Sequence, residues 1–380
     1  MEDGTDLALT AARETQRKLA SIQVVENVIK HWNADSLEIS TLEGLGWQVV
    51  VNVNENIKKK DKVVYCEIDC LLPGSANYLP EAIKQLVEKQ ANKDWFRVKT
   101  IKLRSEISQG LIIPLSNFEK DMKETLEALD EGENVTQLLN IGKYEPTCGV
   151  SEVRSGPRVS TFPSHLLDKT DEIRIQSSTK LLNEIEGQEY YVSVKCDGMS
   201  GTFLVDPDTK EFVVCSRNQV RQKDDACDYW RVATKYNLED KLKNDKFSGY
   251  AIQGEVCGPK IQKNLLNLKD VDFFVFNIVD LKHRQRLSFE EMNMVCNELQ
   301  LKQVDIVEHD TKFECCKFKA ADEEGRTLID TKSTINKLLK LAEGKYPNSK
   351  HQREGIVIRS KDGRISFKVI NNQYLLKNDL

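Results

Sequence analysis

The sequence lacks the features of several protein classes. Its 380 residues include only 19 glycines and 9 prolines, too few for a collagen-like or low-complexity chain. Mean hydropathy is −0.49 and no run of about 18 apolar residues occurs, so we expect no transmembrane helix. The opening MEDGTDLAL is acidic and without the basic-then-apolar layout of a signal peptide, which predicts an intracellular protein, cytoplasmic or nuclear.

Spacings typical of zinc sites and disulfide frameworks are also missing. The ten cysteines form no CxxC pair, and the five histidines are scattered singly along the chain. We therefore expect no zinc site, and we expect the cysteines to be reduced, buried thiols.

Neither sign of charge dominates the composition. Lysine and arginine number 55 against 60 aspartates and glutamates, a net charge of −5 that argues against a nucleic-acid packaging role. Transient contact with nucleic acid needs only a local basic face, so a net charge of −5 does not exclude it. The length predicts two or three domains, and a chain of this size can bury its core without disulfides.

The first part of the chain is rich in predicted strands. Apolar or alternating stretches predict strands at 22–29, 47–53, 63–72, 95–103 and 111–115, with one helix at 80–90. Several short strands and one helix are the content of an OB-fold, so we predict an OB-fold β-barrel over residues 1–118. Basic and aromatic residues interleave between Trp95 and Arg104, which indicates either a nucleic-acid face or a solvated strand face.

A connection and a larger domain follow. Residues 119–141 predict a helix, a turn and a second short helix, and residues 144–170 are rich in Pro, Gly, Ser and Thr, so we assign 119–160 as a helical and loop connection. From 161 to 380 we predict an α+β domain. Its strands are expected at 190–196, 202–206, 211–216, 250–256, 272–279, 355–359 and 364–369, and its helices at 175–185, 225–236, 288–299 and 328–343.

One series of residues in this domain points to chemistry. Lys195, Asp197 and Gly198 form the string KCDG at the end of a predicted strand. Asp-Gly alone is a common turn dipeptide, so this string is weak by itself. What strengthens it is the order of the residues that follow, namely Arg217, Glu255, Phe276, Glu354 and Lys368.

The series resembles the motifs of covalent nucleotidyltransferases, which include ATP-dependent ligases and mRNA-capping guanylyltransferases. Lys195 matches the nucleophilic lysine of the first motif. The resemblance implies an ATP-grasp-like, two-sheet ligase adenylation domain. It also implies a catalytic set, Lys195, Asp197, Arg217, Glu255, Glu354 and Lys368, and a nucleotide-binding set, Arg174, Val194, Lys195, Gly198, Arg217, Glu255, Phe276 and Lys368.

The residue types suit this chemistry. An amine attacks phosphorus only when neutral, so Lys195 must lose its proton, and carboxylates alone would raise its pKa. Asp197, Glu255 and Glu354 offer hard oxygens for Mg²⁺ or Mn²⁺ or for the waters of the ion. The cationic Arg217 and Lys368 suit phosphate oxygens, and Phe276 suits either stacking on the purine or ordinary strand packing.

Domain order discriminates within this superfamily. DNA ligases and capping enzymes carry an OB module after the fifth motif, whereas here only twelve residues follow Lys368 and the β-rich segment comes first. This layout resembles a family of ATP-dependent RNA ligases, as do the strings FPSHLLDKTDEIRIQ, which contains Arg174, and QGEVCGPKIQKN. Two departures stand out, because Val194 replaces the glutamate that many ligases place before the nucleophile, and Ser366 and Ile370 flank Lys368 without a second lysine.

The resemblance implies three steps and specific partners. Lys195 attacks ATP to give lysyl-AMP, AMP moves to an RNA 5′-phosphate, and a 3′-hydroxyl then seals the strand. The resemblance implies two divalent ions in the first step and nicked or broken duplex RNA as the substrate. We expect the protein to be a monomer. The alternatives are a DNA ligase or capping guanylyltransferase, distinguished by nucleotide and substrate, and a non-catalytic RNA-binding relative that would form no adenylate.

Overall fold

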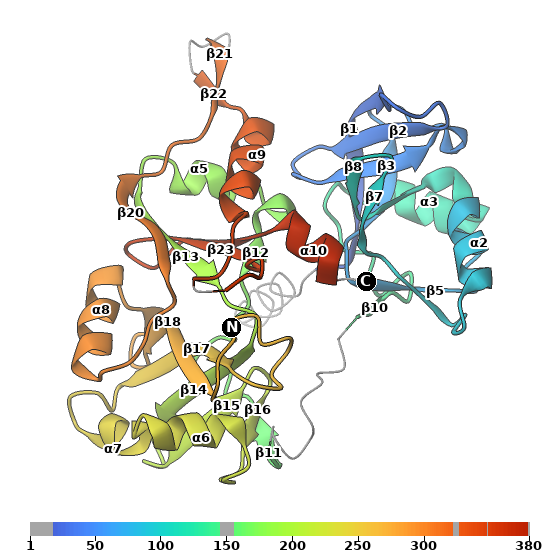
Figure 1. The fold of residues 1–380 in the computed structure, drawn as a ribbon. Helices are drawn as coiled ribbons and strands as arrows, with labels where there is room; N and C mark the ends of the chain where they lie inside the picture. Colours follow the sequence, from blue (N-terminus) through green and yellow to red (C-terminus); the bar gives the residue numbers. More distant parts are fainter. Residues whose placement is uncertain (1–17, 145–155, 322–326, 348, 379–380) are drawn as a thin grey trace, which may run out of the picture. The chain divides into compact units, whose positions relative to one another are not determined.

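The computed structural model describes residues 18–144, 156–321, 327–347 and 349–378. The described residues form two compact units, one within 18–144 and the other within 156–378 (Figure 1). Within the described ranges, no helix is long and apolar enough to cross a membrane.

The first unit is built on a curled antiparallel sheet of five strands in the order β3-β2-β1-β4-β9. These strands are β1 (Ala20–Lys30), β2 (Leu37–Leu42), β3 (Gln48–Asn52), β4 (Lys62–Cys66) and β9 (Leu111–Pro114). Apolar residues of these strands, such as Ile22, Val25 and Val64, are fully buried and form the core of this unit. Smaller sheets join β5 (Cys70–Pro73) to β6 (Trp95–Arg97) and β10 (Gly142–Lys143), and β7 (Thr100–Leu103) to β8 (Glu106–Gln109).

This unit departs from the sequence prediction in several places. The predicted strand 63–72 is two strands, because Asp69 adopts a left-handed conformation (φ 69°) between β4 and β5. The predicted strand 95–103 is likewise divided into β6 and β7. Strand β2 was missed, and residues 129–141 form turns where a second short helix was predicted. The two helices are α2 (Glu81–Lys89) and α3 (Lys120–Ala128).

The second unit contains two main sheets. One has seven strands in the order β11-β16-β15-β14-β17-β18-β19, and the other has five in the order β12-β24-β23-β13-β20 (Figure 1). The seven are β11 (Arg158–Thr161), β14 (Met199–Val205), β15 (Phe212–Ser216), β16 (Gln219–Arg221), β17 (Tyr250–Cys257), β18 (Asp272–Asp280) and β19 (Gln285–Arg286). The five are β12 (Ile173–Arg174), β13 (Glu189–Lys195), β20 (Ile306–Lys312), β23 (Gly355–Ser360) and β24 (Ser366–Ile370).

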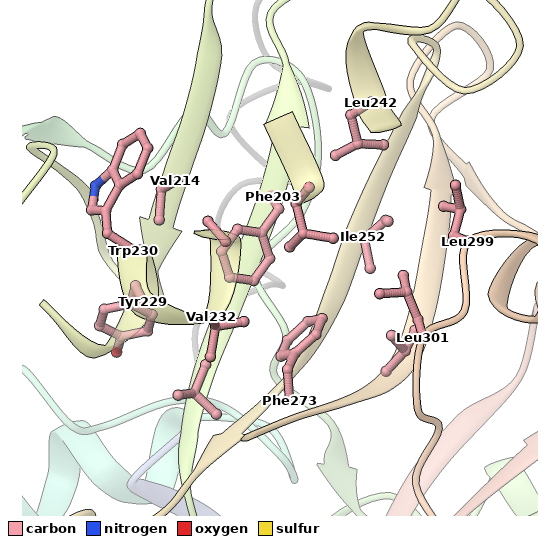
Figure 2. Close-up of a cluster of buried hydrophobic side chains, with 14 of the residues drawn as sticks. Phe203, Val214, Tyr229, Trp230, Val232, Leu242, Ile252, Phe273, Leu299 and Leu301 are labelled. Atoms are coloured by element: carbon pink, nitrogen blue, oxygen red, sulfur yellow. The ribbon is translucent and has the colours of Figure 1, made fainter. Parts of the chain in front are cut away.

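Helices pack on each sheet and close two separate cores. The larger core lies between β14, β17 and β18 and the helices α6 (Asp228–Lys235), α7 (Leu238–Lys243) and α8 (Phe289–Glu298) (Figure 2). At its centre the rings of Phe203 and Phe273 meet edge to face, with centroids 5.0 Å apart. The smaller core joins β13, β23 and β24 to α5 (Leu181–Ile185) and α9 (Thr331–Ala342).

The thiols behave as expected over the described residues. All nine cysteines that the structure describes are thiols, eight of them buried, with Cys316 half-buried. Cys148 lies outside the described residues.

Several elements of the second unit were not anticipated. Helix α7, strand β20, the ribbon of β21 (Lys317–Ala321) and β22 (Thr327–Ile329), and helix α10 (Asn372–Asn378) were all missed. The predicted helix 175–185 is instead a 3-10 turn, η3 (Ile175–Ser177), followed by the five-residue α5. The predicted domain bounds at 118 and 160 stay a prediction, and part of the predicted connection, 145–155, lies outside the described residues.

A glycine in β17 provides a test of this packing. A Cβ on Gly254 would lie 2.5 Å from the Phe273 ring and 2.6 Å from the Phe274 carbonyl oxygen. We predict that Gly254→Ala lowers the free energy of unfolding by about 1–3 kcal/mol, because the buried ring must shift. Gly249→Ala is the matched control, since a Cβ there meets nothing within 4 Å. Chemical denaturation measures both, and equal stability of the two variants would contradict this packing.

Candidate active site

Lys195 lies where the two sheets of the second unit join. It is the last residue of β13 and pairs with Gly355 at the start of β23 in the five-stranded sheet. Residues 196–198 then turn the chain into β14 of the seven-stranded sheet. The lysine therefore stands at the strand ends of both sheets, a position at which side chains from both can converge.

Carboxylates from both sheets converge on this lysine. Its Nζ donates to Oε2 of Glu354 at 2.8 Å, and the side chains of the pair are 25% and 17% exposed. Glu255, on β17, approaches from the other sheet and accepts a hydrogen bond from the Gly198 amide at 3.1 Å. Asp197 in the connecting turn adds a third carboxylate whose charge acts on Lys195.

Gly198 is required by the closeness of this approach. A Cβ at that position would lie 2.5 Å from the Val256 carbonyl oxygen and 2.8 Å from Cγ of Glu255. Any larger residue would push the turn away from β17 and lengthen the hydrogen bond to Glu255. The glycine of the KCDG string thus brings the first-motif turn against the strand that carries Glu255.

The position of Glu354 depends on its neighbour Arg353. The buried Arg353 guanidinium donates to the carbonyl oxygens of Leu341, Ala342 and Glu343 and so caps the C-terminal end of α9. This ties the segment before β23 to a packed helix. Glu354 therefore enters the site from a fixed backbone.

In the protein without nucleotide or metal, the carboxylates keep Lys195 charged. Burial disfavours the ammonium of Lys195, but the charges of Glu354, Glu255 and Asp197 outweigh it and raise the pKa of Lys195. This agrees with the expectation that carboxylates alone would raise it. Lys195 is consequently a protonated, unreactive amine until its surroundings change.

Two of the carboxylates are perturbed in return. Burial, with the nearby charge of Glu354, raises the pKa of Asp197 to about 6. Burial likewise raises the pKa of Glu255 to about 7, although Lys195 opposes the shift. Crowded acidic groups that resist ionisation are typical of a site built for a cation.

These oxygens fit a divalent ion held through its waters. Asp197, Glu255 and Glu354 are all hard ligands and all act on Lys195. Over the ranges that the structure describes, no three His, Cys, Asp or Glu side chains lie close enough together to hold an ion directly. The predicted arrangement, in which carboxylates order the water shell of an ion, does not require direct ligation.

A second group of charges is cationic. Arg174 of β12 pairs in register with Lys368 of β24, so the two cations lie side by side on parallel strands. Burial, together with the charges of Lys195 and Arg174, lowers the pKa of Lys368 to about 7. Arg217 follows β15 and is half-exposed, and its guanidinium bonds Asp171, whose charge in turn acts on Lys368. An anion such as phosphate would relieve the repulsion among these cations.

Phe276 occupies a β-bulge in β18. Gln253 pairs with Asn277 and Gly254 with Val275, which leaves Phe276 as the extra residue. Its ring is half-buried beside Cys196 and Cys257, and the guanidinium of Arg359 lies 5.6 Å from the ring centroid. A bulge re-aims a side chain and is common beside active sites.

A buried ion pair supports this bulge. Arg359 donates to the Phe276 carbonyl oxygen and to the carboxylate of Glu172 at 2.7 Å. Burial opposes ionisation of Glu172, but Arg359 and Arg286 outweigh it and lower the pKa to about 2. The pair connects the segment before β12 to β23 and β18.

Val194 contributes a buried side chain. It packs with Leu265 and Tyr346, and its amide donates to the Asp305 carbonyl oxygen at 2.8 Å. Its predicted role, nucleotide recognition through backbone groups, stays a prediction.

The structure thus brings together most residues of the predicted series. Lys195, Asp197, Glu255, Glu354, Lys368 and Arg174 interact with one another, Gly198 bonds Glu255, and Arg217 joins through Asp171. The sequence prediction missed Asp171 and Glu172, which lie in the string FPSHLLDKTDEIRIQ, and Arg359, which ends the predicted strand 355–359. It also missed Tyr346 and Tyr374, for which no motif gave a signal.

Comparisons with known proteins agree with this arrangement. A family model for RNA ligase matches residues 188–370, and a model for an OB-fold domain matches residues 19–115. A Naegleria gruberi RNA ligase with pyrophosphate is 30% identical, with a TM-score of 0.81 over 96% of this chain and 99% of that one. The chain belongs to the RNA ligase family.

Further solved structures of the Naegleria gruberi RNA ligase are also similar to this chain. A mutant with ATP and Mn is 30% identical, with a TM-score of 0.81 over 96% of this chain and all (100%) of that one. Another, with AMP and Mn, is 29% identical, with a TM-score of 0.80 over 96% and 99% of the two chains. A search of curated proteins gave no match. The predicted family, fold class and OB-first domain order are confirmed.

The raised pKa of Glu255 predicts a pH dependence of stability. The folded chain holds a proton that the unfolded chain releases above its ordinary pKa of 4.5, so this stabilisation is complete below about 4.5 and is lost as pH rises through about 7. Glu255→Gln keeps the acceptor for Gly198 and removes the titration. We compare the unfolding free energy of the variant with that of the unaltered protein, with metals chelated. We predict that this difference shifts in favour of the variant by about 2 kcal/mol when the pH rises from 5 to 8. Denaturant titrations at both pH values measure this gain, and parallel stability profiles would contradict the assigned shift.

Proposed function

We propose that this RNA ligase uses ATP to join RNA ends through a covalent adenylate on Lys195. The observation that carries the proposal is the contact of the Lys195 Nζ with Glu354, 2.8 Å apart, with Lys368 and Arg174 close by. The relatives solved with ATP and Mn or with AMP and Mn support the choice of nucleotide and of a divalent ion, Mg²⁺ or Mn²⁺.

The first step forms a bond from the Lys195 Nζ to the α-phosphorus of ATP and breaks the bond to the pyrophosphate oxygen. Lys368, whose buried amine is half neutral near pH 7, regains its charge beside a phosphate. Arg174 and Lys368 then stabilise the negative charge that pyrophosphate carries away. When bound, divalent ions, two in this proposal, would offset the charge of Asp197, Glu255 and Glu354 and so let Lys195 lose its proton.

The later steps transfer AMP to the 5′-phosphate of an RNA end and release it as the 3′-hydroxyl attacks. Breaking the Lys195–phosphorus bond returns the amine to its contact with Glu354. We propose nicked or broken duplex RNA as the substrate. Phe276 would stack on the adenine, Val194 and Gly198 would line the nucleotide site, and Arg217 would leave Asp171 for a phosphate oxygen.

The proposal assigns residues 1–118 to an OB-fold domain that holds RNA, 119–160 to the connection, and 161–380 to adenylation. It also assigns every residue of the site to one chain and takes the protein to act as a monomer.

Covalent labelling tests the proposal. Incubation with α-labelled ATP and Mg²⁺ is expected to leave label on the intact protein, whereas α-labelled GTP is expected to leave none. Lys195→Ala removes the attacking nitrogen and should reduce labelling to background. Lys243→Ala is the control, because this exposed lysine pairs with Glu239 on α7, away from the site. Label that persists in Lys195→Ala would contradict the assignment.

Sealing assays then separate the substrates. Labelled protein should join a nicked RNA duplex more than about tenfold faster than the same nick made of DNA only, since the hydroxyls that distinguish RNA are then present. Equal rates on the two duplexes would favour a DNA ligase.

A further inference from the structure

Tyr346 lies at the centre of the site although it belongs to none of the recognised motifs. It follows α9 and is only 2% exposed. Its hydroxyl donates to the carbonyl oxygen of Lys195 at 3.0 Å and accepts from the amide of Glu354 at 3.1 Å. One oxygen atom thus bridges the backbones of the nucleophile and of the carboxylate that binds it.

The Tyr346 hydroxyl links the two backbones just beyond the last backbone pair of β13 and β23. Pairing between β13 and β23 ends at Lys195 and Gly355. A Cβ on Gly355 would lie 2.2 Å from the Val369 carbonyl oxygen, so β24 already presses on this point from the other side. Beyond it, the tyrosine hydroxyl supplies both the donor and the acceptor that another pair of residues would have supplied.

A second tyrosine acts on the next carboxylate. The hydroxyl of Tyr374, on α10, hydrogen-bonds the carboxylate of Asp197. The ring packs with Tyr346 around Val194 and Leu265.

The start of α10 is fastened to the same backbone. The amide of the fully buried Asn371 donates to the Glu354 carbonyl oxygen at 2.9 Å, and its side-chain amide donates to the Arg353 carbonyl oxygen at 3.1 Å. The helix that carries Tyr374 is therefore anchored next to Glu354.

Resting on the proposed function, we propose that Tyr346 is a positioning residue for adenylation, and that Tyr374 has the same role for Asp197. Tyr346 sets the separation of Lys195 and Glu354 through their backbones. Both partners of its hydroxyl are backbone groups, so its role concerns the placement of the attacking nitrogen and not the affinity for ATP. Loss of placement slows a reaction steeply, by about 100-fold for a shift of about 1 Å.

The experiment measures single-turnover formation of lysyl-AMP over a range of ATP concentrations at saturating Mg²⁺. Tyr346→Phe removes only the bridging oxygen. We expect a rate at saturating ATP at least about tenfold below that of the unaltered protein, with the half-saturating ATP concentration within about twofold. Tyr374→Phe should show a smaller loss of the same kind.

Tyr190→Phe is the matched control. Tyr190 lies on the same strand as Lys195, is 8% exposed, and donates its hydroxyl hydrogen bond to Glu308. This variant likewise removes only a tyrosine hydroxyl, here from the strand that carries Lys195, so it should lower the melting temperature without slowing adenylation.

The outcomes are distinct. Tyr346→Phe that adenylates as fast as Tyr190→Phe would overturn the inference, as would a loss confined to ATP half-saturation. If Tyr346→Phe fails to fold, Tyr374→Phe decides, since a rate equal to that of the unaltered protein contradicts the positioning role. Absence of lysyl-AMP in the unaltered protein would instead refute the proposed function itself.

Discussion

The arrangement of the site depends on the ion pair between Lys195 and Glu354. Lys195 ends β13 and Glu354 immediately precedes the neighbouring strand β23, and their side chains meet 2.8 Å apart while remaining largely shielded from water. A partly buried pair of this kind is stable only when the surrounding structure holds both partners. Arg353 ties the segment before Glu354 to α9, and the turn after Lys195 is pressed against β17 at Gly198.

The pair explains why two lysines in one site behave in opposite ways. Lys195 lies among three carboxylates, which raise its pKa. Lys368 lies near Lys195 and Arg174, and burial with these cations lowers its pKa to about 7. Without nucleotide or metal, Lys195 is therefore held as an ammonium, whereas Lys368 can bind a proton near pH 7. Binding of a polyanion with its cations would move both groups toward the opposite state, which couples reactivity to the arrival of substrate.

The residues that take part in the chemistry were predicted from the sequence better than the residues that hold them in place. The four residues Lys195, Glu255, Glu354 and Lys368 were identified because their order along the chain resembles the motif series of covalent nucleotidyltransferases. The strands around them were placed because their apolar patterns are strong. Tyr346 was missed because its hydroxyl bonds only backbone groups, which leave no trace in residue spacing. The bulge at Phe276 was missed for a related reason, since a bulge changes register without changing the apolar pattern.

Local structure limited the fold prediction in the same way. The predicted strand 63–72 was broken by Asp69 in a left-handed conformation, which an apolar alternation cannot reveal. Short elements such as β22 and α10 were missed because their stability comes from tertiary packing, not from their own periodicity. The long strands β13, β17 and β18, which carry the site, were predicted because both faces are buried.

The central claim is that carboxylates hold Lys195 as an ammonium until nucleotide and metal arrive, and the ¹⁵N resonance of its Nζ tests this most directly. The protein would be labelled with ¹⁵N-lysine, and the signal assigned by its loss in Lys195→Ala. Without nucleotide or metal, the account predicts an ammonium shift that stays constant from pH 6 to about pH 10, because the pKa of Lys195 is raised above its ordinary 10.5. A resonance that titrates to the neutral amine near pH 7 would contradict the account.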